Sequence, residues 1–158
     1  MYGHEETSRE MLIEEYQADI EKILRYLPWL VKKSGNDVRS FYEGEEGKKV
    51  MPIPVFDSTL LSFVKDIGNT KLISKNYPYV YTKYRIKDHS DQLRLMKNAR
   101  IQEIDLIKAI LSKYVLGGRT KASMWTEAVD ERIFATALEC LNELFFTNTP
   151  DGKRMLRF

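Results

Sequence analysis

The chain has 158 residues, of which 43% are hydrophobic and 30% are charged, and its formal net charge is +2. This length and composition predict one globular domain over residues 1–158 and exclude a chain that is mostly disordered. The single cysteine, Cys140, excludes an internal disulfide framework. There is no apolar run of about 18 residues and no signal peptide, so we expect a cytoplasmic protein without a membrane segment.

The first predicted element is an amphipathic helix. Apolar residues at helical spacing predict that it runs from a Ser8 cap to about Leu27, where Pro28 should break it. A turn over residues 34–37 follows the apolar residues after this proline.

A small β-hairpin is predicted next. Residues 38–42 and 49–51 read as short strands on either side of a loop with two glycines. We expect Pro52 and Pro54 to end the hairpin, because proline cannot donate to a strand ladder.

The middle of the chain predicts three further helices. Asp57 is a good cap for a helix over 58–67, and residues 70–81, with an internal proline, predict an extended loop. Thr82 and Ser90 are then expected to cap short helices that reach Lys87 and about Asn98.

The C-terminal half predicts the most hydrophobic helix of the chain, over 101–116, which we expect to be central. Helices over 122–129 and 130–146 follow it. The predicted fold class is therefore α+β, mostly α, with about five to seven helices and a small β-hairpin. We expect flexibility at residues 1–7 and 147–158.

Charge is segregated along the sequence. Residues 5–22 hold seven acids and two bases, whereas residues 71–100 hold eight bases and two acids. Such segregation favours either two elements that neutralise each other within the fold or separate acidic and basic faces.

Within the basic region, residues 71–87 alternate bases with tyrosines and contain no acid. Bases and aromatic rings in this pattern are typical of a protein-binding surface, of a nucleic-acid-binding segment, or of tyrosines packed on a core beneath solvated lysines. We predict a protein partner, with nucleic acid as the alternative. The candidate binding residues are Lys75, Tyr77, Tyr79, Tyr81, Lys83, Tyr84, Arg85, Lys87 and, in a separate glycine-containing turn, Arg119.

The sequence contains no recognisable catalytic motif, so we expect a non-enzymatic protein without a cofactor or metal. His4 and His89 have no metal-ligand spacing, and Cys140 is expected to be a buried structural thiol. Arg119 and Lys121 are candidates either for an anion contact or for complementing a helix C-terminus. An enzyme of unknown type, using these two bases with Asp130 and Glu131, is the remaining alternative.

Short motifs lie at residues 25–30 (RYLPWL), 53–56 (IPVF), 60–66 (LLSFVKD) and 81–84 (YTKY), followed by an apolar helix, Arg119 and a final helix. Over about residues 16–145, this order of motifs resembles the uncharacterised bacterial domain family DUF6508. The turn at 119–123 (RTKAS) lacks the Phe and Gly of the family pattern. The resemblance implies a bacterial, phage or mobile-element origin, and an inhibitor of a host or defence protein as one form of the predicted binder.

Overall fold

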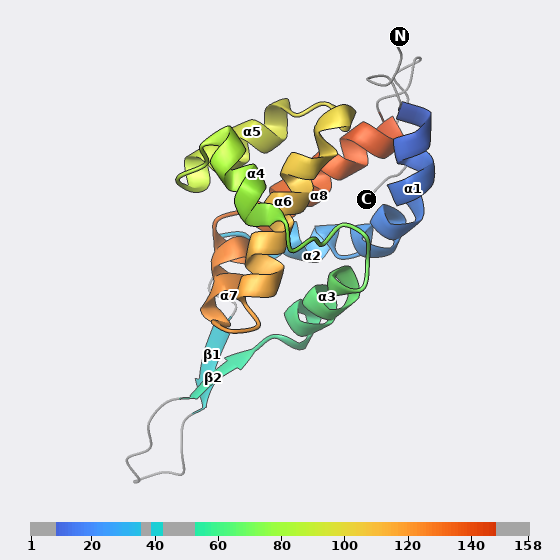
Figure 1. The fold of residues 1–158 in the computed structure, drawn as a ribbon. Coiled ribbons are helices and arrows are strands. Elements are labelled where there is room, and N and C mark those ends of the chain that lie inside the picture. The colour runs from blue at the N-terminus through green and yellow to red at the C-terminus, as the bar shows by residue number, and fades with distance from the viewer. Residues whose placement is uncertain (1–8, 36–38, 43–52, 148–158) are drawn as a thin grey trace, which may run out of the picture.

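The computed structural model describes residues 9–35, 39–42 and 53–147 (Figure 1). These residues form eight α-helices, a 3₁₀ turn η1, a π-helical turn η2 and two short strands. The helices are α1 (Arg9–Leu24), α2 (Leu27–Lys33), α3 (Ser58–Gly68), α4 (Tyr77–Tyr84), α5 (His89–Asn98), α6 (Ile104–Gly117), α7 (Ser123–Asp130) and α8 (Ile133–Asn142). The remaining elements are β1 (Arg39–Tyr42), β2 (Ile53–Phe56), η1 (Ile101–Glu103) and η2 (Glu143–Thr147).

The predicted α+β class is wrong, because the domain is all-α and has more helices than expected. In the described residues, β1 and β2 pair only with each other, antiparallel, with Arg39 opposite Phe56. Each strand has four residues, which is too short to form a layer on which helices pack. The pair of strands projects from one end of the helical body (Figure 1). Pro54 lies inside β2 rather than beyond it, since a two-stranded ribbon has outer edges that need no N–H donor. The predicted strand at 49–51 lies outside the described residues.

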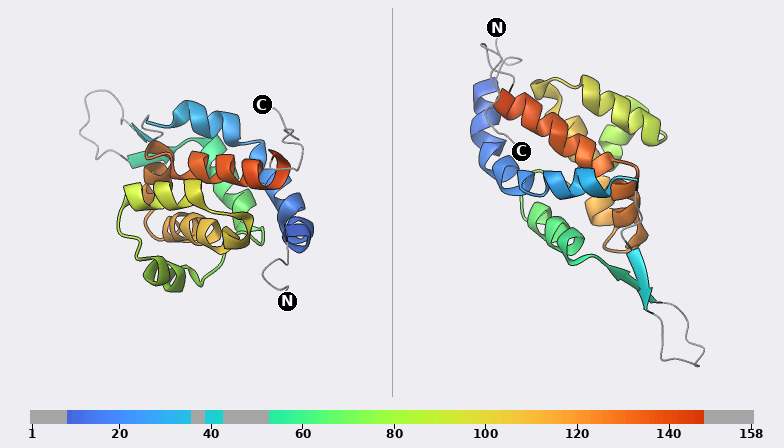
Figure 2. Two further views of the ribbon diagram at one scale, coloured as in Figure 1. Left: turned by 90° about the horizontal axis from the view of Figure 1, so that it is seen from above. Right: turned by 180° about the vertical axis from the view of Figure 1, so that it is seen from behind.

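Helix α6 is central, as its apolar coverage predicts. Residues on most sides of it are buried, and Ile107, Ile110 and Leu111 are fully enclosed. Helices α3, α4, α5, α7 and α8 all contact it. Figure 2 shows α6 between α4 and α1, so these two helices lie on different sides of the core.

The break before Pro28 is confirmed. The first helix ends at Leu24, and α2 begins at Leu27 with Pro28 in its first turn, where no N–H donor is needed. Between the two helices, the Tyr26 hydroxyl donates to Asp66 Oδ2 at 2.5 Å, which joins this corner to α3. The predicted cap Ser8 and the termini at 1–7 and 148–158 lie outside the described residues.

Helix α3 confirms the prediction from Asp57, whose Oδ1 accepts from the Thr59 N–H at 2.7 Å. The predicted loop over 70–81 is wrong for its last residues, because α4 starts at Tyr77 with Pro78 in its first turn. Thr82 is not a cap, since it lies inside α4 and donates to the Pro78 carbonyl.

Two further helix boundaries differ from those predicted. Asp88, rather than Ser90, caps α5 by accepting from the Asp91 N–H at 2.9 Å. The predicted helix over 130–146 is interrupted, because Arg132 adopts a left-handed conformation (φ 63°) before α8 starts at Ile133. None of the helices in the described ranges has the length and apolar character needed to cross a bilayer.

Candidate functional site

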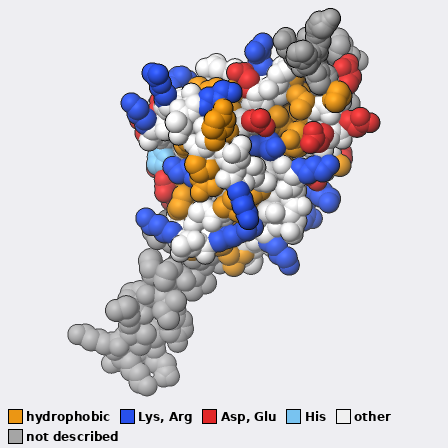
Figure 3. All heavy atoms as spheres, viewed as in Figure 1, with side chains coloured by type: hydrophobic (Ala, Val, Ile, Leu, Met, Phe, Trp, Pro, Cys, Tyr) orange, Lys and Arg blue, Asp and Glu red, His pale blue; other side chains and the backbone are white. Residues whose placement is uncertain are grey.

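The outward side of α4 and its flanking residues carries the bases that the sequence singled out. We define the basic face as Lys75, Tyr79, Lys83, Arg85 and Lys87, all of which are exposed. None of its four cationic side chains lies within ion-pair distance of a carboxylate in the described part of the chain. Figure 3 shows Lys and Arg side chains interleaved with hydrophobic ones on this side of the molecule. These cations are therefore available to an external anion.

The four tyrosines of this segment divide between the core and the solvent. Tyr79 is 64% exposed, whereas Tyr77, Tyr81 and Tyr84 are half-buried and pack against the core cluster. Tyr77 and Tyr81 meet edge to face, with ring centroids 6.4 Å apart. Only Tyr79 therefore presents most of its ring to a partner.

Tyr81 belongs to a polar network beneath the basic face. The Gln92 side-chain amide, almost fully buried, donates from Nε2 to the Tyr81 hydroxyl at 2.7 Å and accepts at Oε1 from the Tyr114 hydroxyl at 3.0 Å. Burial raises the pKa of Tyr81 above its ordinary value and that of Tyr114 to about 12, so both stay neutral at physiological pH. Lys113 Nζ lies 4.9 Å from the Tyr81 ring centroid. The network fixes α4 on α5 and α6, and thereby holds the basic face in one orientation.

A cleft of about 280 Å³ separates α4 from η1 and the start of α6. Buried Val80 and Ala109 contribute apolar surface to it, and Tyr79 and Lys83 line it from the side of α4. The full lining is Ser74, Asn76, Tyr77, Tyr79, Val80, Lys83, Tyr84, Gln102, Glu103, Asp105, Lys108 and Ala109.

The α6 side of this cleft was missed by reasoning from the sequence. Lys108 Nζ donates to the Tyr16 hydroxyl at 2.8 Å and lies 3.8 Å from Asp105 Oδ1, so its charge is already used within the fold. The sequence signal that could have revealed this side of the cleft is the polar pair Asp105 and Lys108, which are three residues apart on a mostly apolar helix.

Arg119 is not part of this arrangement. Its side chain is exposed beyond the end of α6. Its Nη2 would lie 2.8 Å from a Cβ added to Gly68, so the guanidinium lies close to the end of α3. It does not line the cleft beside α4. The sequence placed Arg119 at the C-terminus of the helix that it follows, α6, whereas its guanidinium lies beside the last turn of α3.

The enzyme alternative grouped Glu131 with Arg119, Lys121 and Asp130. Glu131 instead lies 3.5 Å from His89 Nδ1, and Glu127 is 2.6 Å from Nε2 of the same ring. Among the described residues, no three His, Cys, Asp or Glu side chains are grouped so that they would hold a metal ion. His4 lies outside the described residues.

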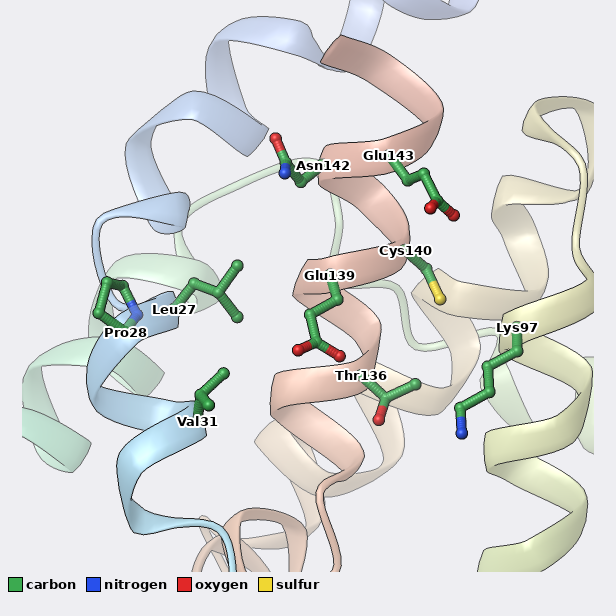
Figure 4. Close-up of a pocket in the computed structure, with 9 residues that line it drawn as sticks. All are labelled: Leu27, Pro28, Val31, Lys97, Thr136, Glu139, Cys140, Asn142 and Glu143. Carbon is green, nitrogen blue, oxygen red and sulfur yellow. The ribbon is translucent and has the colours of Figure 1, made fainter. Parts of the chain in front are cut away.

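A larger cavity, of about 560 Å³, lies between α2, α5 and α8 (Figure 4). Cys140 lines it, and burial raises the pKa of the thiol to about 11, with a further contribution from Glu143. At neutral pH this cysteine is therefore a thiol rather than a nucleophilic thiolate.

The acids of the N-terminal region form a second, separate face. We define the acidic face as Glu10, Met11, Glu14 and Glu15, all exposed on α1. In the described ranges, no α1 carboxylate is ion-paired with a base of 71–100, although Asp19 accepts the backbone N–H of Lys71. Figure 1 shows α1 and α4 on different sides of α6. Of the two interpretations of the charge segregation, the described structure supports separate faces.

Comparisons with protein-family models, with curated proteins and with solved structures each gave no match to this chain. The resemblance to DUF6508 therefore stays a prediction.

Proposed function

We propose that this protein is a non-enzymatic binding protein whose basic face engages an acidic surface of a protein partner. The observation that supports this is a set of four exposed cations, on α4 and on the residues that flank it, which have no ion-pair partner in the described part of the chain. Tyr79, the exposed tyrosine of the same segment, lies on α4, which the Gln92 network holds in place. A free, solvated lysine is ordinary, but a group of them around an exposed aromatic ring has the composition of an interface.

The division of the tyrosines favours a protein partner over single-stranded nucleic acid. Stacking of successive bases needs several ring faces along one groove, whereas Tyr77, Tyr81 and Tyr84 are packed against the core. One exposed tyrosine in a segment that also exposes an arginine and lysines is sufficient as the anchor of a protein interface.

The partner's surface should combine carboxylates with a small apolar projection. Carboxylates match the charge of Lys83, Arg85 and Lys87, and the cleft between α4 and α6 offers apolar contact beside Tyr79. Charge complementarity of this kind steers association and makes it salt-dependent.

The test is capture from a lysate of the producing cells with three tagged proteins. The first is the wild type, the second carries Lys83→Glu, Arg85→Glu and Lys87→Glu, and the third carries Lys22→Glu, Lys65→Glu and Lys121→Glu. The control variant makes the same charge change at exposed bases away from α4. We expect the wild type and the control to retain the same proteins, and the α4 variant to lose them with its thermal stability unchanged.

Nuclease treatment of the lysate separates the two partner classes. Retention of the captured proteins after treatment supports a protein partner. Loss of capture after nuclease, or equal capture by the α4 variant and the wild type, would overturn the proposal.

A further inference from the structure

The two charged faces each contain an exposed apolar side chain. In the described residues, the exposed large hydrophobic side chains are Met11, Val31, Leu61 and Tyr79. Met11, 62% exposed, belongs to the acidic face on α1, and Tyr79, 64% exposed, lies four residues from both Lys75 and Lys83 of the basic face. An apolar anchor ringed by charge is the usual anatomy of an interface centre.

The cleft beside Tyr79 is lined mostly by polar and charged residues, but it also offers aromatic and aliphatic contacts that a methionine can use. Its surface includes Tyr77, Val80, Tyr84 and Ala109, and its volume of about 280 Å³ exceeds what one flexible, unbranched side chain requires. A thioether also makes favourable contacts with the edges of aromatic rings, which Tyr77, Tyr79 and Tyr84 provide.

We propose that the partner of the basic face is a second copy of this chain, whose Met11 enters the cleft while Glu14 and Glu15 meet Lys83 and Arg85. This inference rests on the proposed function, since it names the acidic surface that the basic face engages. Glu10 and Glu15 flank Met11 on α1, and none of these glutamates is ion-paired within the described structure.

The cleft also holds two acids, Glu103 and Asp105, on the side of η1 and α6. Glu103 accepts from the Arg100 N–H at 2.9 Å, and Asp105 lies 3.8 Å from Lys108, so both are partly compensated on the α6 side. The uncompensated cations are on the α4 side, where the acidic face is expected to dock.

The proposed contact joins two different surfaces, because α1 of one copy meets α4 of another. The two faces lie on different sides of α6 (Figures 1 and 2), so one molecule does not satisfy its own surfaces. Association closes into a dimer if both α1–α4 contacts form between the same two copies, and extends into rings or chains if they do not; in either case it weakens as salt screens the charges.

A charge-swap experiment tests this contact by sedimentation velocity of the whole chain at about 50 mM salt, where screening is weak. One variant carries Glu10→Lys, Glu14→Lys and Glu15→Lys, and the other carries Lys75→Glu, Lys83→Glu and Arg85→Glu. We expect each variant alone to associate at least about tenfold more weakly than the wild type, and the equimolar mixture to recover association within about threefold. Circular dichroism checks that each variant is folded.

Three results would overturn the proposal: a wild type that stays monomeric at low salt, unchanged association of either variant alone, or a folded mixture that stays monomeric. The variant with Lys22, Lys65 and Lys121 changed to Glu should associate like the wild type. If association between copies fails while lysate capture still depends on α4, only this inference falls. If capture is also independent of α4, the proposed function falls with it.

Discussion

The inner and outer sides of α4 use the same residue type in opposite ways. On the inner side, Tyr81 packs on the core and its hydroxyl accepts from buried Gln92. On the outer side, two residues earlier, Tyr79 is mostly exposed among lysines. The difference teaches that position on the helix, rather than composition, decides which tyrosines stabilise the fold and which remain for a partner.

The largest effect on stability is expected where the interior has no space, at the end of α6. A Cβ on Gly118 would lie 2.1 Å from Nε1 of Trp125, the atom that donates to the Val115 carbonyl at 3.1 Å. Gly118→Ala should therefore lower the free energy of unfolding by about 2–3 kcal/mol, measured by urea denaturation.

Gly117→Ala is the matched control for this substitution. Its Cβ would meet the tip of the flexible Met124 side chain, which moves more readily than an indole. Its loss should be clearly smaller, and equal losses at the two glycines would contradict the role given to Trp125.

The second-largest effect on stability is expected in the hydrogen-bond network beneath the basic face. Gln92→Leu removes the partner of the Tyr81 and Tyr114 hydroxyls in a buried setting, so it should cost about 2 kcal/mol in urea denaturation. Gln102→Leu, at an exposed position, is the control and should stay within about 0.5 kcal/mol of the wild type. If Gln92→Leu were equally neutral, α4 would not depend on this network for its position.

A smaller, pH-dependent effect is expected where the corner between α1 and α2 meets Asp66 of α3. Hydrogen bonds from Tyr26 and Arg25 lower the pKa of Asp66 below 3.8, so its stabilising contribution is present above that pH and disappears as the carboxylate is protonated below it. Asp66→Asn should therefore cost about 1 kcal/mol at neutral pH, and the gap to the wild type should close in acid. Unfolding curves at neutral and acid pH measure this gap, and a gap that widened in acid would contradict the assignment.

The smallest effect on stability, and the largest on binding, is expected at Tyr79. Because its ring is exposed, Tyr79→Ala should change the free energy of unfolding by less than about 0.5 kcal/mol. The same substitution should weaken partner capture at least about tenfold, as loss of an interface anchor does. Unchanged capture would remove Tyr79 from the contact surface, and marked destabilisation would place it with the inner tyrosines.

Local signals were sufficient to predict part of the fold. Asp57 before an apolar run predicted α3, and the continuous apolar coverage of 101–116 predicted the central helix. By contrast, α4 contains Pro78, a valine and four tyrosines, and its helical state depends on packing against α6, which no local rule supplies. The left-handed conformation of Arg132, which interrupts the last predicted helix, could not be predicted either, because glycine is the residue that usually marks that conformation.

The sequence predicted which segment carries the candidate site, but not which of its side chains are exposed together. Residues 71–87 drew attention through their charge and aromatic content, yet the separation of Tyr81 from Tyr79 depends on Gln92 and Tyr114, which come from other helices. The α6 side of the cleft was missed for the same reason, because Asp105 and Lys108 approach α4 only in the folded chain.

The most direct test of the basic face is carbodiimide cross-linking of the protein to whatever it binds, read by mass spectrometry. This reagent joins lysine amines to carboxylates in contact. The account predicts intermolecular cross-links from Lys75, Lys83 and Lys87 to Asp or Glu residues of the partner, whether a second copy or another protein. Cross-links concentrated at Lys22, Lys65 or Lys121, with none from the three lysines of the basic face, would contradict it.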